Sequence, residues 1–244
     1  MNDSIGKAFI KQTMHSNLQH DQSEKKLPPQ LEMPYQGVAI KLPKPTSFKG
    51  LKVTVKNAIN NRKSIREYAD EPLSKLELSF ALYSMQGVHK TVKNTTFRTV
   101  PSAGARHAFE TLVLVNNVKS LTSGLYHYIA IEHQLVKINT QNDISSQLTK
   151  ACLNQKMVKN AAVTFFFIAD IYRMTYRYGE RGYRYIFLDA GHIVQNLYLV
   201  AQEMDAGTVA IGAFDDAAVN ALFNLDGEAQ FVVYAAPLGK RLKD

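Results

Sequence analysis

The sequence is poor in cysteine: its 244 residues contain only Cys152. A single cysteine excludes an intramolecular disulfide framework, and it also excludes a cysteine-based zinc or iron–sulfur cage within one chain. No apolar stretch reaches the length of a membrane span, and the N-terminal residues lack the apolar core of a signal peptide. We therefore expect a cytoplasmic protein that has no membrane partner.

Several common functional motifs are also missing. There is no GxGxxG after a predicted strand and no GxxxxGK[ST], which excludes the common nucleotide-binding fingerprints. There is no HExxH, and none of the seven histidines lies four residues from another, so we expect no metal site. There is no GxSxG motif, and no obvious base lies beside Cys152 in the sequence.

The positive charge is unevenly distributed. The net charge is +8, and the first 60 residues hold nine lysines against four acidic residues. Because no basic run alternates with aromatic residues, we expect a solvated lysine-rich segment and no nucleic-acid partner. Five of the eight prolines also lie in this segment. Residues 1–50 are therefore predicted to form an extended arm, and residues 51–244 a single domain.

The longest helical pattern covers Tyr185–Met204. Its apolar residues recur at the i, i+4, i+7 and i+8 spacing of one helix face, and the helix would be about 30 Å long. Leu188 and Leu199 make the opposite face apolar as well. A helix that is apolar nearly all round is buried either in a core or against a partner chain. The pattern therefore predicts the central helix of the fold, either at a dimer contact or inside a monomer.

The remaining pattern predicts an α+β fold whose mixed or antiparallel sheet is surrounded by helices. Ser74 and Glu77 form a capping box at the start of one helix, and Asp215 can cap another. Helices are predicted at residues 53–60, 75–86, 144–153 and 216–223. Strands are predicted at residues 111–115, 125–129, 134–138, 161–169, 207–214 and 231–235, and a polar loop at 88–97.

Three cations and a hydroxyl group fall within five residues at Arg62, Lys63, Ser64 and Arg66. Such a cluster can bind a phosphate, because a guanidinium group donates two parallel hydrogen bonds and a serine adds a third. A solvated basic helix end would show the same composition.

Two segments of small residues can bring the backbone close to a flat ligand: residues 101–105, PSAGA, and residues 211–213, IGA. Ordinary turns have the same composition. Near the end of the chain, Lys240 and Arg241 could return to the same phosphate or form a loose basic tail.

Six segments, taken together and in order, carry a resemblance to a known family. The segments are NRKSIREYADEPLSKLELSFAL, FRTVPSAGARHAFE, SGLYHY, YRYGERGYRYIFLDAGHIVQNLYL, AIGAFDD and PLGK. With these segments, the chain resembles the nitroreductase-like flavoproteins and, within them, the SagB-type dehydrogenases that form thiazoles and oxazoles in peptides. The resemblance covers about residues 7–241.

The resemblance implies a homodimer around the long helix with FMN at its interface, and NAD(P)H as a possible electron donor. By similarity, the phosphate and ribityl chain of FMN would be held by Arg62, Lys63, Ser64, Arg66 and Lys240. The isoalloxazine ring would be lined by Pro101, Ser102 and Gly104, and Ile211 and Gly212 would lie near its reactive nitrogen.

Tyr178, with Arg177 as its helper, is the predicted catalytic residue. Azoline oxidation needs a base that removes a ring proton. A tyrosine ionises at about pH 10, and a neighbouring cation favours its phenolate form. The segment offers positive potential from Arg173, Arg177, Arg181 and Arg184. An aromatic–cationic stack that only anchors the long helix is the alternative.

Some residues differ from the pattern of the family. Lys63 stands where a second arginine is common, and Arg106-His107 stands where the subgroup often has Leu-Tyr. Arg177 replaces the lysine of the usual lysine–tyrosine pair, which bears directly on the azoline substrate.

The sequence therefore leaves three functions open. The first is FMN-dependent oxidation of an azoline to an azole in a modified peptide, with the flavin carrying the redox chemistry. The second is an NAD(P)H-dependent reductase of small nitro compounds or quinones. The third is a flavin-binding or partner-binding subunit without turnover of its own.

Overall fold

The computed structural model describes residues 4–139 and 143–243, and it has a seven-stranded antiparallel sheet at its centre. The strand order is β1-β6-β5-β4-β7-β9-β8. This arrangement confirms the predicted α+β fold. The strands are β1 (Ala39–Lys41), β4 (Phe109–Val115), β5 (Gly124–Ile129), β6 (Gln134–Asn139), β7 (Val163–Asp170), β8 (Ala206–Thr208) and β9 (Gln230–Lys240).

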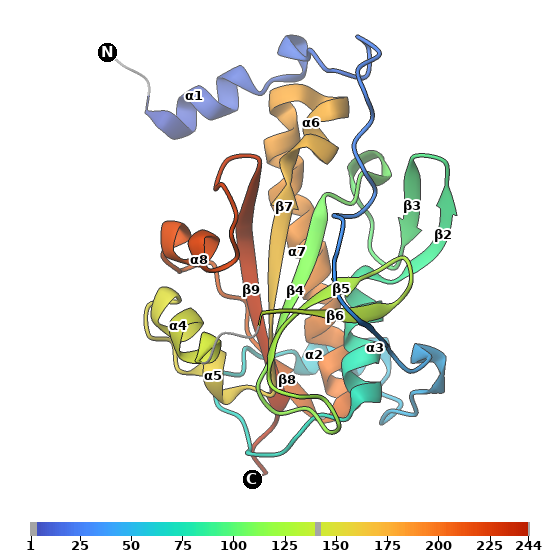
Figure 1. Ribbon diagram of the computed structural model, residues 1–244, viewed down its shortest axis with the longest axis vertical. Coiled ribbons are helices and arrows are strands. Elements are labelled where there is room, and N and C mark those ends of the chain that lie inside the picture. The colour runs from blue at the N-terminus through green and yellow to red at the C-terminus, as the bar shows by residue number, and fades with distance from the viewer. Residues whose placement is uncertain (1–3, 140–142, 244) are drawn as a thin grey trace.

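Helices cover both faces of the sheet (Figure 1). One core lies between the sheet and the pair α3 and α7, and a second core lies between the sheet and α4, α5 and α8. The helices are α1 (Ile5–Gln12), α2 (Val55–Asn61), α3 (Lys75–Gln86), α4 (Ile144–Ala151), α5 (Met157–Asn160), α6 (Ile171–Tyr178), α7 (Gly182–Ala201) and α8 (Asp216–Leu222).

Strand β7 is central, as its continuous apolar run predicts. It pairs with β4 on one side and with β9 on the other. Its side chains alternate between the two cores: Phe165 and Phe167 face α7, whereas Phe166 and Ile168 face the opposite core. Both faces of the strand are therefore dry, which explains why its sequence shows no polar alternation.

Helix α7 runs along one face of the sheet and confirms the predicted long helix. Ile186, Ala190 and Leu197 belong to its buried stripe. Phe187 and Leu188 are 57% and 59% exposed, so the helix also presents apolar side chains to solvent. Among the residues described, no helix has both the length and the apolar character needed to cross a bilayer.

The local signals for several other elements are also confirmed. In the capping box of α3, the Ser74 amide donates to Glu77 (2.7 Å) and the Glu77 amide donates to the Ser74 hydroxyl (3.1 Å). Asp215 accepts from the amide of Ala218 at the start of α8. The hairpin of β5 and β6 also forms as its alternating pattern predicts.

The predicted polar loop at residues 88–97 was wrong. These residues form a hairpin of β2 (Val88–Val92) and β3 (Thr95–Arg98) that lies apart from the main sheet. Its polar side chains suggest a loop, yet several of them are β-branched threonines, which suit a half-exposed strand. Strand β9 is also longer than predicted, because pairing with β7 continues through Pro237.

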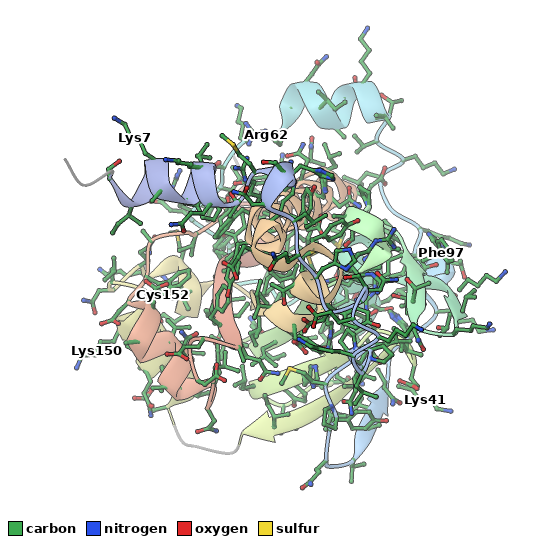
Figure 2. All side chains as sticks on the ribbon, turned by 90° about the horizontal axis from the view of Figure 1, so that it is seen from above. Lys7, Lys41, Arg62, Phe97, Lys150 and Cys152 are labelled. Carbon is green, nitrogen blue, oxygen red and sulfur yellow. The ribbon has the colours of Figure 1, made fainter. Side chains whose placement is uncertain are left out.

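The N-terminal segment crosses the end of the molecule and then follows the sheet (Figure 1). It contains α1, none of whose residues is buried, and β1, which pairs with β6 at the sheet edge. Viewed from above, Lys7 marks α1 at the periphery of the molecule (Figure 2). The segment is fastened to α6 where the Gln22 amide donates to the Tyr176 carbonyl (2.8 Å).

Candidate functional site

The loop of residues 101–107 has a tightly bent backbone. Gly104, Ala105 and His107 all have left-handed φ angles, of 56°, 52° and 44°. For residues other than glycine this conformation is uncommon and costs free energy, and such strain clusters at functional sites. The amide of His107 donates to the Ser102 hydroxyl (2.9 Å), which helps to hold the bend.

Gly104 brings this loop into direct contact with the end of α6. A Cβ atom built on Gly104 would lie 2.5 Å from the Tyr178 hydroxyl oxygen and 3.2 Å from Nε of Arg177. A side chain at this position would therefore collide with the hydroxyl group. The structure thus places the predicted ring-binding loop against both predicted catalytic residues.

Tyr178 is also part of an aromatic cluster at the start of α7. Its ring meets the Tyr185 ring edge to face, with centroids 4.8 Å apart. The Arg177 guanidinium lies 5.7 Å from the centre of the Tyr178 ring, and Arg181 donates to the Tyr185 hydroxyl (2.8 Å). The aromatic–cationic stack proposed as the alternative is therefore present at the start of α7. The Tyr178 hydroxyl also approaches Gly104 of the loop 101–107.

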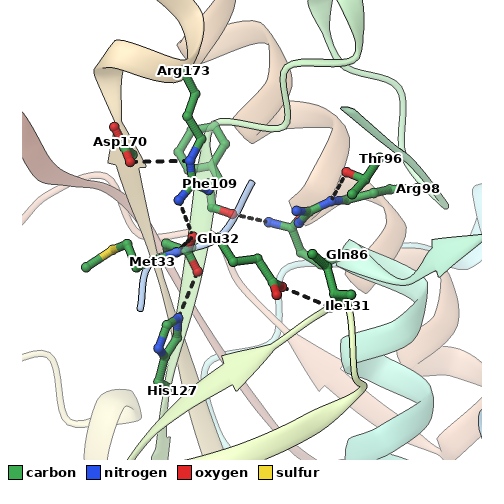
Figure 3. A network of polar contacts seen from close by, with 11 residues as sticks. Glu32, Met33, Gln86, Thr96, Arg98, Phe109, His127, Ile131, Asp170 and Arg173 are labelled. Carbon is green, nitrogen blue, oxygen red and sulfur yellow. Dashed lines mark hydrogen bonds and ion pairs between the residues drawn. The ribbon is translucent and has the colours of Figure 1, made fainter. Parts of the chain in front are cut away.

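The expected positive potential around Tyr178 does not come from all four arginines of this segment. Arg173 is buried and forms ion pairs with Glu110 (2.6 Å) and Asp170 (3.3 Å), as Figure 3 shows. Arg184 donates to the Thr13 hydroxyl of the N-terminal segment. Arg173 and Arg184 are thus engaged by residues other than Tyr178.

Asp189 attaches the loop to α7. One of its carboxylate oxygens accepts from the Ala103 amide (3.3 Å), and the other is buried without a hydrogen-bond partner among the described residues. Burial raises the pKa of this carboxyl group. The contact fixes the position of the loop along α7.

Arg62, Ser64 and Arg66 are called the phosphate-type cluster below. Arg62 and Ser64 contact Tyr198, which lies farther along α7. The Arg62 guanidinium lies 5.1 Å from the centre of the Tyr198 ring, and the Ser64 and Tyr198 hydroxyl oxygens are 3.2 Å apart. The Tyr198 hydroxyl also accepts from the Ala210 amide (2.9 Å). Tyr198 therefore joins the cluster to the segment that follows β8.

That segment carries Ile211 and Gly212. Ile211 exchanges two backbone hydrogen bonds with Ala235 of β9 (2.7 and 2.9 Å), so its amide is already engaged. Gly212 is exposed, and a Cβ atom built on it would meet only the Tyr234 ring, no closer than 3.7 Å. Of these two residues, Gly212 is the one open to a ligand.

The other two predicted phosphate ligands, Lys240 and Lys63, lie in different surroundings. The Lys240 ammonium donates to the Glu77 carboxylate (2.6 Å) and to the Met204 carbonyl (2.6 Å). Burial alone would raise the pKa of Glu77, but hydrogen bonds from Lys240 and Ser74 outweigh it and lower that pKa. Lys63 lines a separate hollow, whose other residues include Lys52, Asn57, Gln202 and Arg241.

The loop and the phosphate-type cluster lie on opposite sides of α7. Asp189 and Tyr198 are nine residues apart, which is about two and a half turns and about 14 Å along the axis. The face between them is exposed at Leu188, His192 and Gln195. Neither contact residue was predicted, because both belong to a helix whose pattern indicated only burial. One chain therefore presents two separate groups of candidate ligands, here called half-sites, with an open helix face between them.

The chemistry of the two half-sites fits FMN. Within residues 4–139 and 143–243, no carboxylate lies within 4 Å of the cationic groups of Arg62 or Arg66, and Arg66 is exposed. These guanidinium groups and the Ser64 hydroxyl are suitable donors for a phosphate. The small residues of the loop 101–107 suit a flat ring.

Comparison with known proteins is consistent with this geometry. Residues 59–240 match the family described as the Nitroreductase family. A nitroreductase-type protein of Methanocaldococcus jannaschii is 32% identical over 191 residues, which are 78% of this chain and 93% of that protein.

Two further similarities are to a processing protein and to a chain of a synthetase complex. The trifolitoxin-processing protein TfxB of Rhizobium leguminosarum is 29% identical over 133 residues, 53% of this chain and 36% of that protein. A chain of the Escherichia coli microcin synthetase McbBCD complex, solved with a truncated pro-microcin bound, shares the fold with a TM-score of 0.62 at 18% identity. That alignment covers 98% of this chain and 92% of that one.

Proposed function

Because the chain belongs to the nitroreductase family, we propose that it is an FMN-dependent oxidoreductase that oxidises an azoline to an azole in a modified peptide. The peptide substrate is supported by the similarity to a trifolitoxin-processing protein and to the fold of a microcin synthetase chain. The observation that carries the proposal is the contact of Gly104 with Tyr178 and Arg177. This contact supports Tyr178 as the base that would act beside a flavin ring held by the loop.

FMN, when bound, would supply the two-electron redox chemistry that no side chain can supply. Arg62, Ser64 and Arg66 would hold its phosphate, and the loop 101–107 would hold its ring. The deprotonated oxygen of Tyr178 would take the proton from the substrate carbon that is being oxidised. Arg177, whose guanidinium lies against the Tyr178 ring, would help to position that oxygen.

The proposed assembly is a homodimer in which the exposed faces of two α7 helices meet. Such a dimer would cover Phe187 and Leu188, whose exposure is unfavourable in an isolated chain. It would also bring the phosphate-type cluster of one chain toward the loop of its partner. One FMN could then span two half-sites that lie on opposite sides of each α7.

Flavin content tests the cofactor directly. The purified protein should be yellow and should release FMN on denaturation. Arg66→Ala should weaken FMN binding about tenfold to a hundredfold, because a charge-assisted phosphate contact contributes roughly 1.5–3 kcal/mol. The control is Lys150→Ala, which removes an equal positive charge from an exposed position on α4. A colourless protein that cannot be reconstituted with FMN would refute the proposal.

Light scattering tests the dimer. The wild-type protein should be dimeric at micromolar concentration, and Leu188→Glu should shift it to monomers because the new charge would be buried at the interface. Leu153→Glu is the matched control, since Leu153 is 58% exposed and lies beyond α4, away from α7. A wild-type monomer that still binds FMN tightly would contradict the assembly.

Substrate assays separate the peptide oxidase from the second candidate. Conversion of an azoline-containing peptide to the azole, measured by a mass loss of two hydrogens, would support the proposal. The alternative is an NAD(P)H-dependent reductase of nitro compounds or quinones, which the similarity to the Methanocaldococcus protein over most of its length favours. Steady NAD(P)H oxidation with a nitroaromatic acceptor, and no azoline turnover, would establish that alternative. FMN that neither substrate class can cycle would identify a subunit without turnover.

A further inference from the structure

Two arginines approach the same glycine of the loop. Arg106 is half-buried, and its Nε donates to the Gly104 carbonyl (3.0 Å). Arg177 is exposed, and its Nε lies 3.2 Å from a Cβ position built on Gly104. The Tyr178 hydroxyl is at the same point. The loop therefore presents two guanidinium groups beside the proposed catalytic hydroxyl.

Neither positive charge is neutralised by a carboxylate. Among the residues that the structure describes, the arginine ion pairs are those of Arg173, and no acidic group lies within 4 Å of the Arg106 or Arg177 guanidinium. The two groups also oppose each other, since burial and then the charge of Arg177 lower the pKa of Arg106. Like charges held together without a counter-ion raise the free energy of the unliganded site, and an anion would lower it.

We propose that Arg106 and Arg177 bind an oxyanion, a carboxylate or a phosphate, carried by the molecule that reacts beside Tyr178. The guanidinium group suits this ligand because its planar fork matches the spacing of two oxyanion oxygens. The inference rests on the proposed redox function and adds a charge requirement to its substrates. A neutral or cationic substrate would leave both arginines without an anionic partner.

The oxyanion has two chemical sources at such a site. It is either a carboxylate of the molecule that is oxidised or reduced, or the 2′-phosphate that distinguishes NADPH from NADH. Both would bring their charge to the same place, and both would orient the reacting group toward Tyr178. Their difference in chemistry makes them separable by experiment.

A purely structural role for the two arginines makes a different prediction. Arg106 would then serve only to fasten the Gly104 carbonyl, and Arg177 only to cover the Tyr178 ring. Loss of either side chain would in that case disturb the binding of charged and neutral ligands equally. A comparison of matched charged and neutral probes therefore distinguishes anion binding from loop support.

The first experiment measures binding without turnover, by calorimetry on the FMN-loaded dimer, or on the protein as purified if no flavin binds. The probes are benzoate, phenyl phosphate and neutral benzamide. At least one anion should bind about tenfold or more tightly than benzamide, and Arg106→Gln and Arg177→Gln should each weaken that anion about tenfold. Benzamide binding should not change, and the charge-matched control Lys150→Gln should behave as wild type. Equal binding of all three probes, or unchanged anion binding in both arginine variants, would overturn the proposal.

The second experiment identifies the source of the oxyanion from steady-state kinetics. If the carboxylate belongs to the acceptor, the preference for para-nitrobenzoate over para-nitrobenzamide should fall about tenfold in Arg177→Gln. If the phosphate belongs to the donor, the preference for NADPH over NADH should fall instead. Either result supports the assignment, and loss of rate without any change in either preference counts against it. Absence of turnover both on an azoline-containing peptide and on NAD(P)H with a nitro acceptor would refute the proposed function, while the calorimetric result would still decide whether the arginines bind an anion.

Discussion

Replacing Tyr178 by phenylalanine is expected to lower turnover on the native substrate by roughly 100-fold or more, while FMN binding and the dimer persist. General acid–base catalysis by a positioned side chain contributes about this much to a rate. The substitution removes a single oxygen atom. Because that oxygen approaches Gly104 at the loop, its loss should affect proton transfer rather than folding.

The substitution also separates catalysis from packing. Phenylalanine keeps the ring that meets Tyr185 edge to face, and it keeps a face for the Arg177 guanidinium. If the cluster only anchors the start of α7, the variant should turn over at the wild-type rate. Kinetics on flavin-loaded protein, normalised to FMN content, distinguish the two interpretations.

Tyr185→Phe is the matched control for this prediction. It removes the same atom from a neighbouring tyrosine of the same cluster. The Tyr185 hydroxyl accepts from Arg181, and among the described residues it forms no hydrogen bond with the loop, so its loss should change turnover by less than about threefold. An equal loss of rate in both variants would show that the two hydroxyl groups support the cluster in the same way and that Tyr178 has no separate catalytic role.

Local sequence signals predicted most of the fold. The apolar run of β7 predicted a strand that is buried on both faces, and the Ser74–Glu77 pair predicted the first turn of α3. Both signals act within a few residues, so no tertiary information is needed to recognise them. The β2–β3 hairpin was missed because its residues are polar. Its two strands pair only with each other and do not join the main sheet.

The site could be predicted only in parts. The composition of 62–66 and 101–105 indicated an anion and a close backbone approach, and the structure places each segment against α7. The sequence could not show that these segments lie on opposite sides of that helix. It also could not show that Lys240 is engaged by Glu77, because the two residues are far apart in the chain.

Buried charges were the least predictable feature. Glu110 of β4 accepts from His127 of β5 (2.8 Å), from the Met33 amide of the N-terminal segment (2.8 Å), and pairs with Arg173 of α6 (2.6 Å). Figure 3 shows these groups converging from three parts of the chain. In the sequence, Arg173 is one of several arginines near tyrosines, and nothing distinguishes it from Arg177, Arg181 and Arg184, none of which is buried.

Replacing Arg173 by methionine is expected to destabilise the fold by about 3–5 kcal/mol at neutral pH. Arg173 is only 1% exposed, and its loss would leave the buried Glu110 carboxylate without its cation. Urea unfolding followed by circular dichroism gives the free energy of unfolding. The control Lys150→Met removes an exposed lysine and should change this free energy by less than about 0.5 kcal/mol.

The pH dependence of this loss identifies Glu110 as its cause. Burial alone would raise the pKa of Glu110, but Arg173 and His127 outweigh burial and hold it at about 2, against an ordinary value of 4.5. A lowered pKa adds stability that is complete above about pH 4.5 and is lost as the pH falls toward 2. Without Arg173, burial should instead favour the protonated carboxyl group, so the variant should approach wild-type stability as the pH is lowered from 7 toward 3.

The double variant Arg173→Met with Glu110→Gln should be less destabilised than the two single changes added together, because it leaves no unpaired buried charge. A destabilisation that stays constant with pH, or single effects that simply add, would show that Arg173 stabilises the fold through its packing and not through Glu110.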